Sequence, residues 1–308
     1  MTKLNAGWAL FLNLIASPLA QADDNYVIRL SNTETLYYQG ALNEAGYQEL
    51  KAKLYPEIRQ LMIKSEGGNA ASGLKIAALI QQHKLNVVVR DYCLSSCFNY
   101  VFLAGVEKSL LLDSVLGFHG FPIQKPEKTR QSQADVVDKT NGETEALSQV
   151  KELGYLFLQQ QGIREDLPAQ LLQRLELAFP AQARQTPIAK LTLGGKTYSH
   201  AADDKLPAWF ASLYQQQTKK HQAQGKKGKV PFAITIDNPF SEQVYFPSQA
   251  ELTVLGVGGI RDYPYPANSD DFKRFTDKFK QQHGLEKIGI AGADLSPSSS
   301  SATASVSH

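Results

Sequence analysis

Two short segments carry the residue types that acyl transfer requires. The first is a pair of glycines, Gly67 and Gly68, which follows an apolar run and precedes an amphipathic one. The second is a pair of serines, Ser95 and Ser96, which precedes an apolar run predicted to be helical. Glycines let backbone N–H groups turn towards a ligand, and a helix N-terminus adds partial positive charge. Such N–H groups hold the oxyanion that forms when a hydroxyl attacks a carbonyl, so the two segments indicate an acyl-transfer site.

The two cysteines, Cys93 and Cys97, flank these serines. In an oxidising compartment such a pair closes into a disulfide, which here would staple one helical turn. Two buried thiols are the alternative. A zinc site is disfavoured, because two sulfurs without a nearby cluster of His or carboxylate residues supply only half of a zinc shell. We therefore predict a disulfide or two buried thiols, and no metal.

The elements that must position these residues follow from hydrophobic patterning. Runs rich in β-branched and aromatic residues predict strands, and apolar residues at helical spacing predict helices. The expected strands are 26–30, 35–42, 58–64, 85–89 and 110–116, and the expected helices are 44–55, 69–82, 93–105, 142–161 and 167–178. The alternation of strand and helix predicts an α/β fold of stacked ββα units, with a core sheet that contains parallel strands.

The N-terminus indicates export. Lys3 precedes a ten-residue apolar run, 7–16, and Ala20-Gln21-Ala22 follows it. This order is typical of a cleavable signal peptide, and the run falls short of the ~20 residues that span a bilayer. We expect 1–22 to be removed, leaving a soluble periplasmic or secreted protein with no membrane span.

The charge of the chain disfavours nucleic acid as a partner. The formal net charge is +2, and it falls by one when Lys3 is removed. The basic run at 219–229 is most simply an exposed loop.

Two other segments are too polar to join a core. Residues 122–140 show no hydrophobic periodicity, so we expect a mobile loop. Residues 295–308 have too few apolar residues to bury a core, so we expect a disordered tail.

The order of these motifs resembles the Clp protease and crotonase superfamily. It runs from an apolar strand through S-x-G-G, a helix with Gly73 and a VVV strand to C-x-S-S-C, F-L-A-G and G-F-H-G. It looks most like the exported members of Gram-negative bacteria that carry a C-x-S-x-C element. The resemblance covers 37–120 and returns at 246–256, where Ser248, Glu251 and Gly256 match the family's helix after the catalytic acid.

The resemblance implies a spiral of ββα units with a long insertion before the C-terminal helix. Residues 23–179 would form the core and 241–294 would complete it. Residues 180–240 would form the insertion, with a hairpin turn at Gly194-Gly195 and the basic run at its tip.

The family's catalytic residues can be carried over by position. In its peptidases a Ser after the second strand attacks the substrate carbonyl, and a His further along takes the proton. His119 stands 23 residues after Ser96 and 24 after Ser95. When the family pattern is aligned without gaps on Ala104-Gly105, its nucleophile position falls on Ser96, which is our first candidate. When the pattern is aligned on the C-x-S-x-C element, that position falls on Ser95. The Gly67-Gly68 turn would supply one oxyanion donor, and the amide after the nucleophile would supply the other.

Two departures from the family pattern bear on activity. Glu66 stands where the family has Pro in S-P-G-G, which puts a carboxylate beside the oxyanion turn. Val244 stands where the family has its catalytic Asp. Three other carboxylates are near in sequence or at a plausible separation, but none matches the motif: Asp166, Asp237 and Glu242. In the simpler structural interpretation, the serines cap a helix and His119 packs at a strand end.

The leading hypothesis is a periplasmic serine hydrolase, most simply a peptidase, that acts on a peptide or protein without a cofactor. The resemblance also implies a homo-oligomer. The alternative is a catalytically inactive binding or assembly protein on the same scaffold, which Val244 and Glu66 favour. Crotonase chemistry on coenzyme A thioesters is a third interpretation, and export disfavours it because coenzyme A is a cytoplasmic cofactor.

Overall fold

The computed structural model describes residues 26–120, 142–202, 205–226, 228, 230, 232–237 and 239–293. Its main sheet has the strand order β1-β2-β3-β4-β5, and β6 also pairs with β4. The strands are β1 (Tyr26–Asn32), β2 (Thr35–Gly40), β3 (Gln60–Ser65), β4 (Asn86–Leu94), β5 (Lys108–Leu110) and β6 (Val115–Gly117). β1 and β2 form an antiparallel hairpin, and all other pairs in this sheet are parallel. The expected mixed α/β architecture with parallel strands is confirmed.

Helices α2 (Glu44–Lys53) and α3 (Ala70–His83) connect the successive parallel strands. Each begins at an asparagine whose side chain caps the first turn. Asn43 accepts from the N–H of Gly46 at 2.7 Å, and Asn69 accepts from the N–H of Ser72 at 2.9 Å. These caps satisfy N–H groups that have no acceptor within the helix. The start of α3 is therefore fixed directly after the Gly67-Gly68 turn.

Strand β4 leads through a sharp turn into the π-helix η1 (Cys97–Phe102), which is fully buried. Helix α3 packs closely against η1 at Gly73. A Cβ at this position would lie 2.9 Å from Cδ2 of Tyr100, so only glycine permits this approach. Gly73, which the motif order placed in this helix, is thus required by the packing of α3 against η1.

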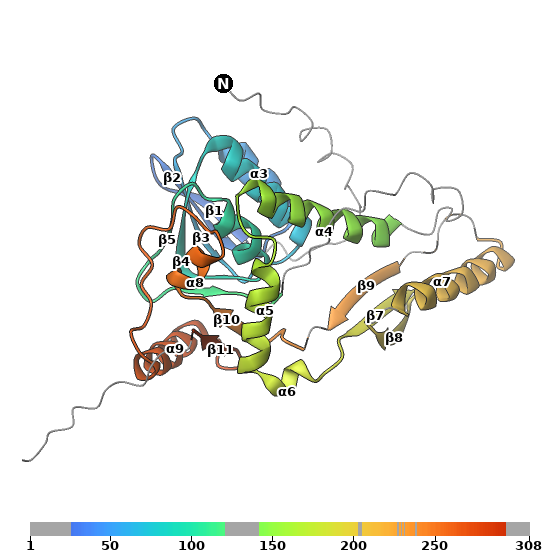
Figure 1. Cartoon of the computed structure of the whole chain (residues 1–308). Helices are drawn as coiled ribbons and strands as arrows, with labels where there is room; N and C mark the ends of the chain where they lie inside the picture. The colour runs from blue at the N-terminus through green and yellow to red at the C-terminus, as the bar shows by residue number, and fades with distance from the viewer. Residues whose placement is uncertain are drawn as a thin grey trace, which may run out of the picture.

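The C-terminal part of the chain returns to the main sheet. Strands β10 (Gln243–Phe246) and β11 (Gly289–Gly292) form a parallel pair. Phe118 and Tyr245 exchange two backbone hydrogen bonds, of 2.9 and 2.7 Å, which hold β10 alongside the end of β6. Helices α8 (Gln249–Val254) and α9 (Ser269–His283) lie between β10 and β11 in sequence. Before them in sequence, α4 (Gly142–Gln160) lies beside α3 in the main body, and α5 (Leu167–Ala178) and α6 (Pro180–Ala183) lead from it towards the insertion (Figure 1).

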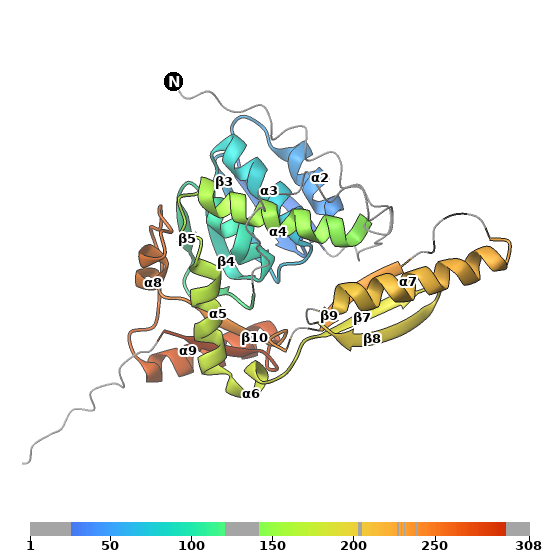
Figure 2. The same cartoon turned by 45° about the vertical axis from the view of Figure 1, so that its right-hand side comes forward.

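The residues expected to form an insertion fold as a small module of their own. Strands β7 (Ile188–Leu193), β8 (Lys196–Ala201) and β9 (Phe232–Asp237) form an antiparallel sheet in the order β8-β7-β9, joined by helix α7 (Leu206–Ala223). Its hydrophobic cluster is separate from the main core and consists of Leu191, Leu193, Phe210, Tyr214 and Val230. The module stands to the side of the main body in both views (Figures 1 and 2).

Three expectations about these elements need correction. The strand expected at 110–116 is two short strands, because Asp113 adopts a left-handed conformation with φ of 60° and turns the chain between them. The helix expected from Cys93 begins later, because Cys93 and Leu94 still pair with β6. The basic run is not wholly a loop, since Lys219 and Lys220 belong to α7. The hairpin turn at Gly194-Gly195 is confirmed, with φ of 56° and 80°.

The residues expected to form a signal peptide, 1–22, a mobile loop, 122–140, and a disordered tail, 295–308, lie outside the described residues. Among the residues that are described, no helix combines the length and the apolar character needed to cross a membrane.

Candidate active site

Ser95 occupies a sharp turn between a strand and a helix. β4 ends at Leu94 and η1 begins at Cys97, and between them Ser95 has φ of 55°. This left-handed conformation is uncommon for a residue with a side chain, and at functional sites it projects a side chain from a tight turn. Ser95 is half-buried, and its carbonyl accepts from the N–H of Asn99 at 2.9 Å. This strand-to-helix turn resembles the nucleophile elbow of hydrolases, and we call it the Ser95 elbow.

Gly67 packs directly against this turn. A Cβ on Gly67 would lie 2.7 Å from Cβ of Ser95 and 2.7 Å from the carbonyl oxygen of Leu94. Gly67 also has φ of 93°, which a residue with a side chain rarely adopts. The absence of a side chain at Gly67 therefore lets the turn after β3 approach the turn after β4.

Ser96 has a different role from Ser95. It is 4% exposed, and its Oγ donates to the carbonyl of Gly68 at 3.0 Å. This bond ties the start of η1 to the glycine turn. The hydroxyl of Ser96 is thus engaged with the backbone, whereas Ser95 lies at the half-exposed apex of the elbow.

The glycine turn presents one N–H that is available to a ligand. The N–H of Gly67 donates to Oγ of Ser65 at 3.0 Å, and the N–H of Asn69 donates to the carbonyl of Leu42 at 2.8 Å. Between them, the N–H of Gly68 makes no hydrogen bond with the described part of the chain. The N–H of Ser96 lies in the first turn of a helix, where intrahelical acceptors are absent. These two groups are the candidate oxyanion donors.

His119 lies just beyond the strand that neighbours β4. Leu94 is paired with Gly117 across β4 and β6, and the N–H of Ser95 donates to the carbonyl of Gly117 at 2.8 Å. His119 follows two residues later, so the sheet brings Ser95 and His119 to the carboxyl ends of adjacent parallel strands. This edge is where ligands bind in open α/β sheets.

The ring of His119 is held by the backbone. Burial lowers the pKa of His119, and a hydrogen bond with the backbone of Phe240 opposes that shift. A bond that raises the pKa of an imidazole favours its protonated form, so the ring donates and the carbonyl of Phe240 accepts. Neither of these influences comes from a carboxylate. Val244, which the sequence resemblance aligned with a catalytic Asp, is 3% exposed and packs beside Gly117, so its side chain supplies only apolar contact.

Two of the carboxylates that the sequence left open as a third residue are engaged elsewhere. Asp166 accepts two hydrogen bonds from the guanidinium of Arg164, at 2.9 and 2.6 Å. Asp237 forms an ion pair with Lys190 at 2.6 Å. For Glu242, the contact shown is through its backbone carbonyl, which accepts from the N–H of Gly289 at 2.7 Å.

Cys93 and Cys97 form a disulfide with a Cα–Cα distance of 5.2 Å. The predicted bond is confirmed, but it does not staple one helical turn. It joins the next-to-last residue of β4 to the first residue of η1 and closes a ring around Ser95. Both cysteines are fully buried, so the bond braces the elbow from inside the core.

The side chain of Glu66 is exposed and engaged by the neighbouring strand. It makes a hydrogen bond with Tyr92 on that strand. Burial, together with the carboxylates of Glu66 and Asp91, raises the pKa of Tyr92 to about 12. Tyr92 thus remains a phenol that donates to the carboxylate of Glu66 at neutral pH.

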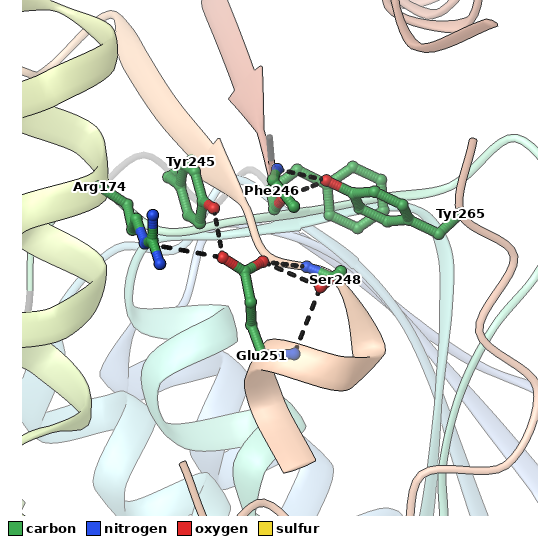
Figure 3. Close-up of polar contacts among 7 residues, drawn as sticks. Arg174, Tyr245, Phe246, Ser248, Glu251 and Tyr265 are labelled. Atoms are coloured by element: carbon green, nitrogen blue, oxygen red, sulfur yellow. Dashed lines mark hydrogen bonds and ion pairs between the residues drawn. The ribbon is translucent and has the colours of Figure 1, made fainter. Parts of the chain in front are cut away.

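A second polar cluster anchors the segment after β10 (Figure 3). One oxygen of Glu251 accepts from the hydroxyl of Tyr245 at 2.6 Å, and the other accepts from the N–H and hydroxyl of Ser248 at 2.8 and 3.0 Å. The guanidinium of Arg174 lies 3.9 Å from the same carboxylate. This cluster fixes the start of α8 against β10 and α5, and therefore the position of the strand beside Phe118.

A hollow of about 110 Å³ adjoins this cluster. None of its lining residues belongs to the Ser95 elbow, the glycine turn or the His119 segment: they are Arg174, Leu177, Ala178, Tyr245 and Gly292. The described residues contain no group of three or more His, Cys, Asp or Glu side chains that could hold a metal ion.

No family model matches this chain, and no curated protein matches it. Among solved structures, a mutant of ClpP1 from Listeria monocytogenes is 15% identical with a TM-score of 0.33, and the match covers 46% of this chain and 79% of that one. A mutant of the 1510-N membrane-bound stomatin-specific protease is 16% identical with a TM-score of 0.25, covering 32% and 54%. The chain thus spans about half the length of the second structure. These scores are too low to assign an activity or a substrate.

Two residues of the site were not found from the sequence. Asn99 stands four residues after Ser95, so helical spacing alone could have placed it beneath the serine. Phe240 acts through its backbone carbonyl, which every residue type possesses, so no sequence signal marks it.

Proposed function

We propose that this protein is a serine hydrolase, most simply a peptidase, that works with a Ser-His dyad. Ser95 is the nucleophile and His119 is the general base. The N–H groups of Gly68 and Ser96 hold the oxyanion, and the carbonyl of Phe240 orients the imidazole. The observation that carries this proposal is the left-handed Ser95 turn, which lies against Gly67 and is hydrogen-bonded to the strand that leads to His119.

The reaction follows the general course of acyl transfer. Oγ of Ser95 attacks the substrate carbonyl while its proton passes to a ring nitrogen of His119. The negative charge that forms on the carbonyl oxygen is held by the two N–H groups. The tetrahedral intermediate then collapses and the C–N bond breaks, and His119 returns the proton to the leaving amine. Water, deprotonated by His119, hydrolyses the acyl-enzyme and restores Ser95.

The orienting group is the main difference from a triad. A buried carboxylate stabilises the protonated imidazole as well as orienting it, and replacing it by an uncharged group costs about four orders of magnitude in rate in one well-studied triad. A backbone carbonyl orients the ring and gives only partial charge stabilisation. We therefore expect turnover of a substrate to be slow, and covalent labelling of the serine to be easier to detect than turnover.

A fluorophosphonate probe tests the proposal directly. The mature protein is labelled and digested, and the modified serine is located by mass spectrometry. We expect the label on Ser95, its loss in Ser95→Ala and His119→Gln, and its retention in the matched variant Ser96→Ala. The proposal fails if the wild type resists a probe that labels a control hydrolase under the same conditions. A label on Ser96 would instead assign the nucleophile to that residue.

A second candidate function is binding or assembly without catalysis. The burial of Val244 at the acid position favours it, because this site lacks the carboxylate that the family's peptidases use. Folded, oligomeric protein that never takes up the probe would support this alternative.

We further propose that the protein is exported and self-associates. The disulfide supports export, because such bonds persist in oxidising compartments. Self-association is expected from the resemblance seen in the sequence, and four of the large apolar side chains that a second copy could cover are Leu112, Leu156, Leu177 and Val254, which are 83%, 39%, 69% and 70% exposed. Light scattering on the mature protein tests the assembly, and a monomer at micromolar concentration would contradict it.

A further inference from the structure

Asn99 touches both halves of the proposed site. It lies one turn beyond Ser95, and its backbone N–H donates to the carbonyl of Ser95 at 2.9 Å. Its side-chain Nδ2 donates to the carbonyl of Gly120 at 2.6 Å, and Gly120 directly follows His119. One residue therefore joins the helix that carries the nucleophile to the segment that carries the base.

The orientation of the Asn99 amide is fixed by its partner. The carbonyl of Gly120 can only accept, so the amide must present Nδ2 to it and point Oδ1 elsewhere. Asn99 is 2% exposed, and its Oδ1 is buried without a hydrogen bond to any described residue. A buried acceptor without a donor destabilises a fold. The buried Oδ1 of Asn99 therefore lowers the stability of the fold, whereas the bond from Nδ2 to the carbonyl of Gly120 raises it.

Other contacts among the described residues also hold the chain around His119. The pairing of β4 with β6 ends at Leu94 and Gly117. Beyond Gly117, the Phe118–Tyr245 bridge holds the backbone on one side and Phe240 holds the ring of His119. Among the described residues, the bond from Asn99 ties the backbone after His119 to η1, and the ring of Phe98 in η1 also packs against Phe118, with ring centroids 6.0 Å apart.

We propose that Asn99 is a positioning residue that sets the separation between the hydroxyl of Ser95 and the ring of His119. This inference rests on the proposed function of the pair. Asn99 does not touch the substrate in this scheme. It acts by holding Gly120 against the helix whose first turn carries Ser95, so that the ring lies within reach of the nucleophile.

Two variants and one matched control test the inference in the full mature chain. Asn99→Ala removes the side chain, and Asn99→Asp keeps its size but cannot donate to Gly120 when ionised. Ser114→Ala is the control, because Ser114 is 1% exposed and accepts from the N–H of Asp91 at 3.0 Å, outside the site. Asn99→Asp carries the test if Asn99→Ala does not fold.

Two readouts are needed for each variant. The first is the kinetics of fluorophosphonate labelling, which give two parameters. These are the maximal labelling rate and the probe concentration at which half of that rate is reached. The second is the pKa of His119 from NMR titration, with its signal assigned by His119→Gln. We expect the maximal rate to fall about 10- to 100-fold in the Asn99 variants, with the half-saturating concentration unchanged. The pKa of His119 should rise in both variants, and Ser114→Ala should change neither quantity.

The outcomes separate this inference from the proposed function. Wild-type labelling rates and an unchanged His119 pKa in both Asn99 variants would overturn it. Equal changes in Ser114→Ala would also overturn it, because they would reflect general loosening. If the wild type is never labelled, the proposed function fails and the NMR titration alone decides. In that case, a change in the His119 pKa in the Asn99 variants alone supports the role of Asn99 in positioning His119. An unchanged pKa in these variants rejects that role.

Discussion

Gly67 and Ser95 lie so close that a Cβ on the glycine would be 2.7 Å from Cβ of the serine. The two residues belong to different turns, one after β3 and one after β4, and the glycine turn carries the Gly68 N–H that the proposed mechanism uses. Their contact places the Gly68 N–H, the proposed oxyanion donor, near Ser95, the proposed nucleophile. It also makes Gly67 sensitive to any added side chain.

Gly67→Ala should therefore destabilise the protein and abolish labelling. Its positive φ and the clash with the carbonyl oxygen of Leu94 together predict a loss of about 3 kcal/mol in the free energy of unfolding. Gly162→Ala is the matched control, since Gly162 has φ of 68° but nothing within 4 Å of an added Cβ. We expect that control to lose about 1 kcal/mol in urea unfolding and to keep its labelling. Equal losses in the two variants would show that packing at the elbow is unimportant.

Replacing Ser95 with glycine should give a more stable protein than replacing it with alanine. Ser95 has φ of 55°, which glycine adopts without steric conflict. Ser95→Gly is therefore expected to raise the free energy of unfolding by up to about 1 kcal/mol relative to Ser95→Ala, which retains the conflict. Both variants should lose labelling. Urea denaturation of the two variants side by side measures the difference, and a less stable glycine variant would argue against strain at this turn.

Reduction of the disulfide should weaken both the fold and the elbow. The bond closes a ring of five residues, so chain entropy predicts a loss of about 2 kcal/mol when it opens. We expect the melting temperature and the labelling rate of the wild type to fall in a phosphine reductant. A Cys93→Ala/Cys97→Ala double variant serves as the control and should not respond to the reductant. A labelling rate that is unchanged in fully reduced protein would show that the bond serves stability alone.

The pH dependence of labelling should reflect the burial of His119. A general base must be neutral, and burial lowers the pKa of His119 below its ordinary value of 6.5. The ring thus stays neutral to a lower pH than in an exposed histidine. We expect the labelling rate to fall only as the pH drops through this lowered pKa, so that the midpoint of the acid limb lies below 6.5.

The same shift has a consequence for stability. The folded state binds a proton at His119 less readily than the unfolded state does. The contribution of His119 to the free energy of unfolding is therefore full above the unfolded pKa and is lost as the pH falls through the folded pKa. His119→Gln should flatten this part of the stability profile in chemical denaturation. An acid limb centred above 6.5 would mean that the ring is solvated or paired with a charge.

Local patterning was sufficient for most elements of the main body. α5 begins and ends where its periodicity predicts, and α3 differs by one residue at each end. The cap residues and glycines that bound these helices act over one turn of chain, so sequence alone contains the information. The disulfide followed from two cysteines four residues apart in the same way. The two strands around Asp113 were merged into one, because a left-handed aspartate between apolar residues has no strong local signal.

The sequence by itself determined the α/β class, the glycine turn, the serine pair and the histidine that follows them, because each depends on residue type and short spacing. Only the tertiary structure distinguished the two serines. Ser95 and Ser96 are chemically identical, and their environments differ through the left-handed backbone of Ser95 and the hydrogen bond from Ser96 to the carbonyl of Gly68. Likewise, Phe240 meets His119 from 121 residues away through a group that every residue carries. Contacts made by the backbone between distant segments leave no mark in residue identity, so they are decided when the chain folds.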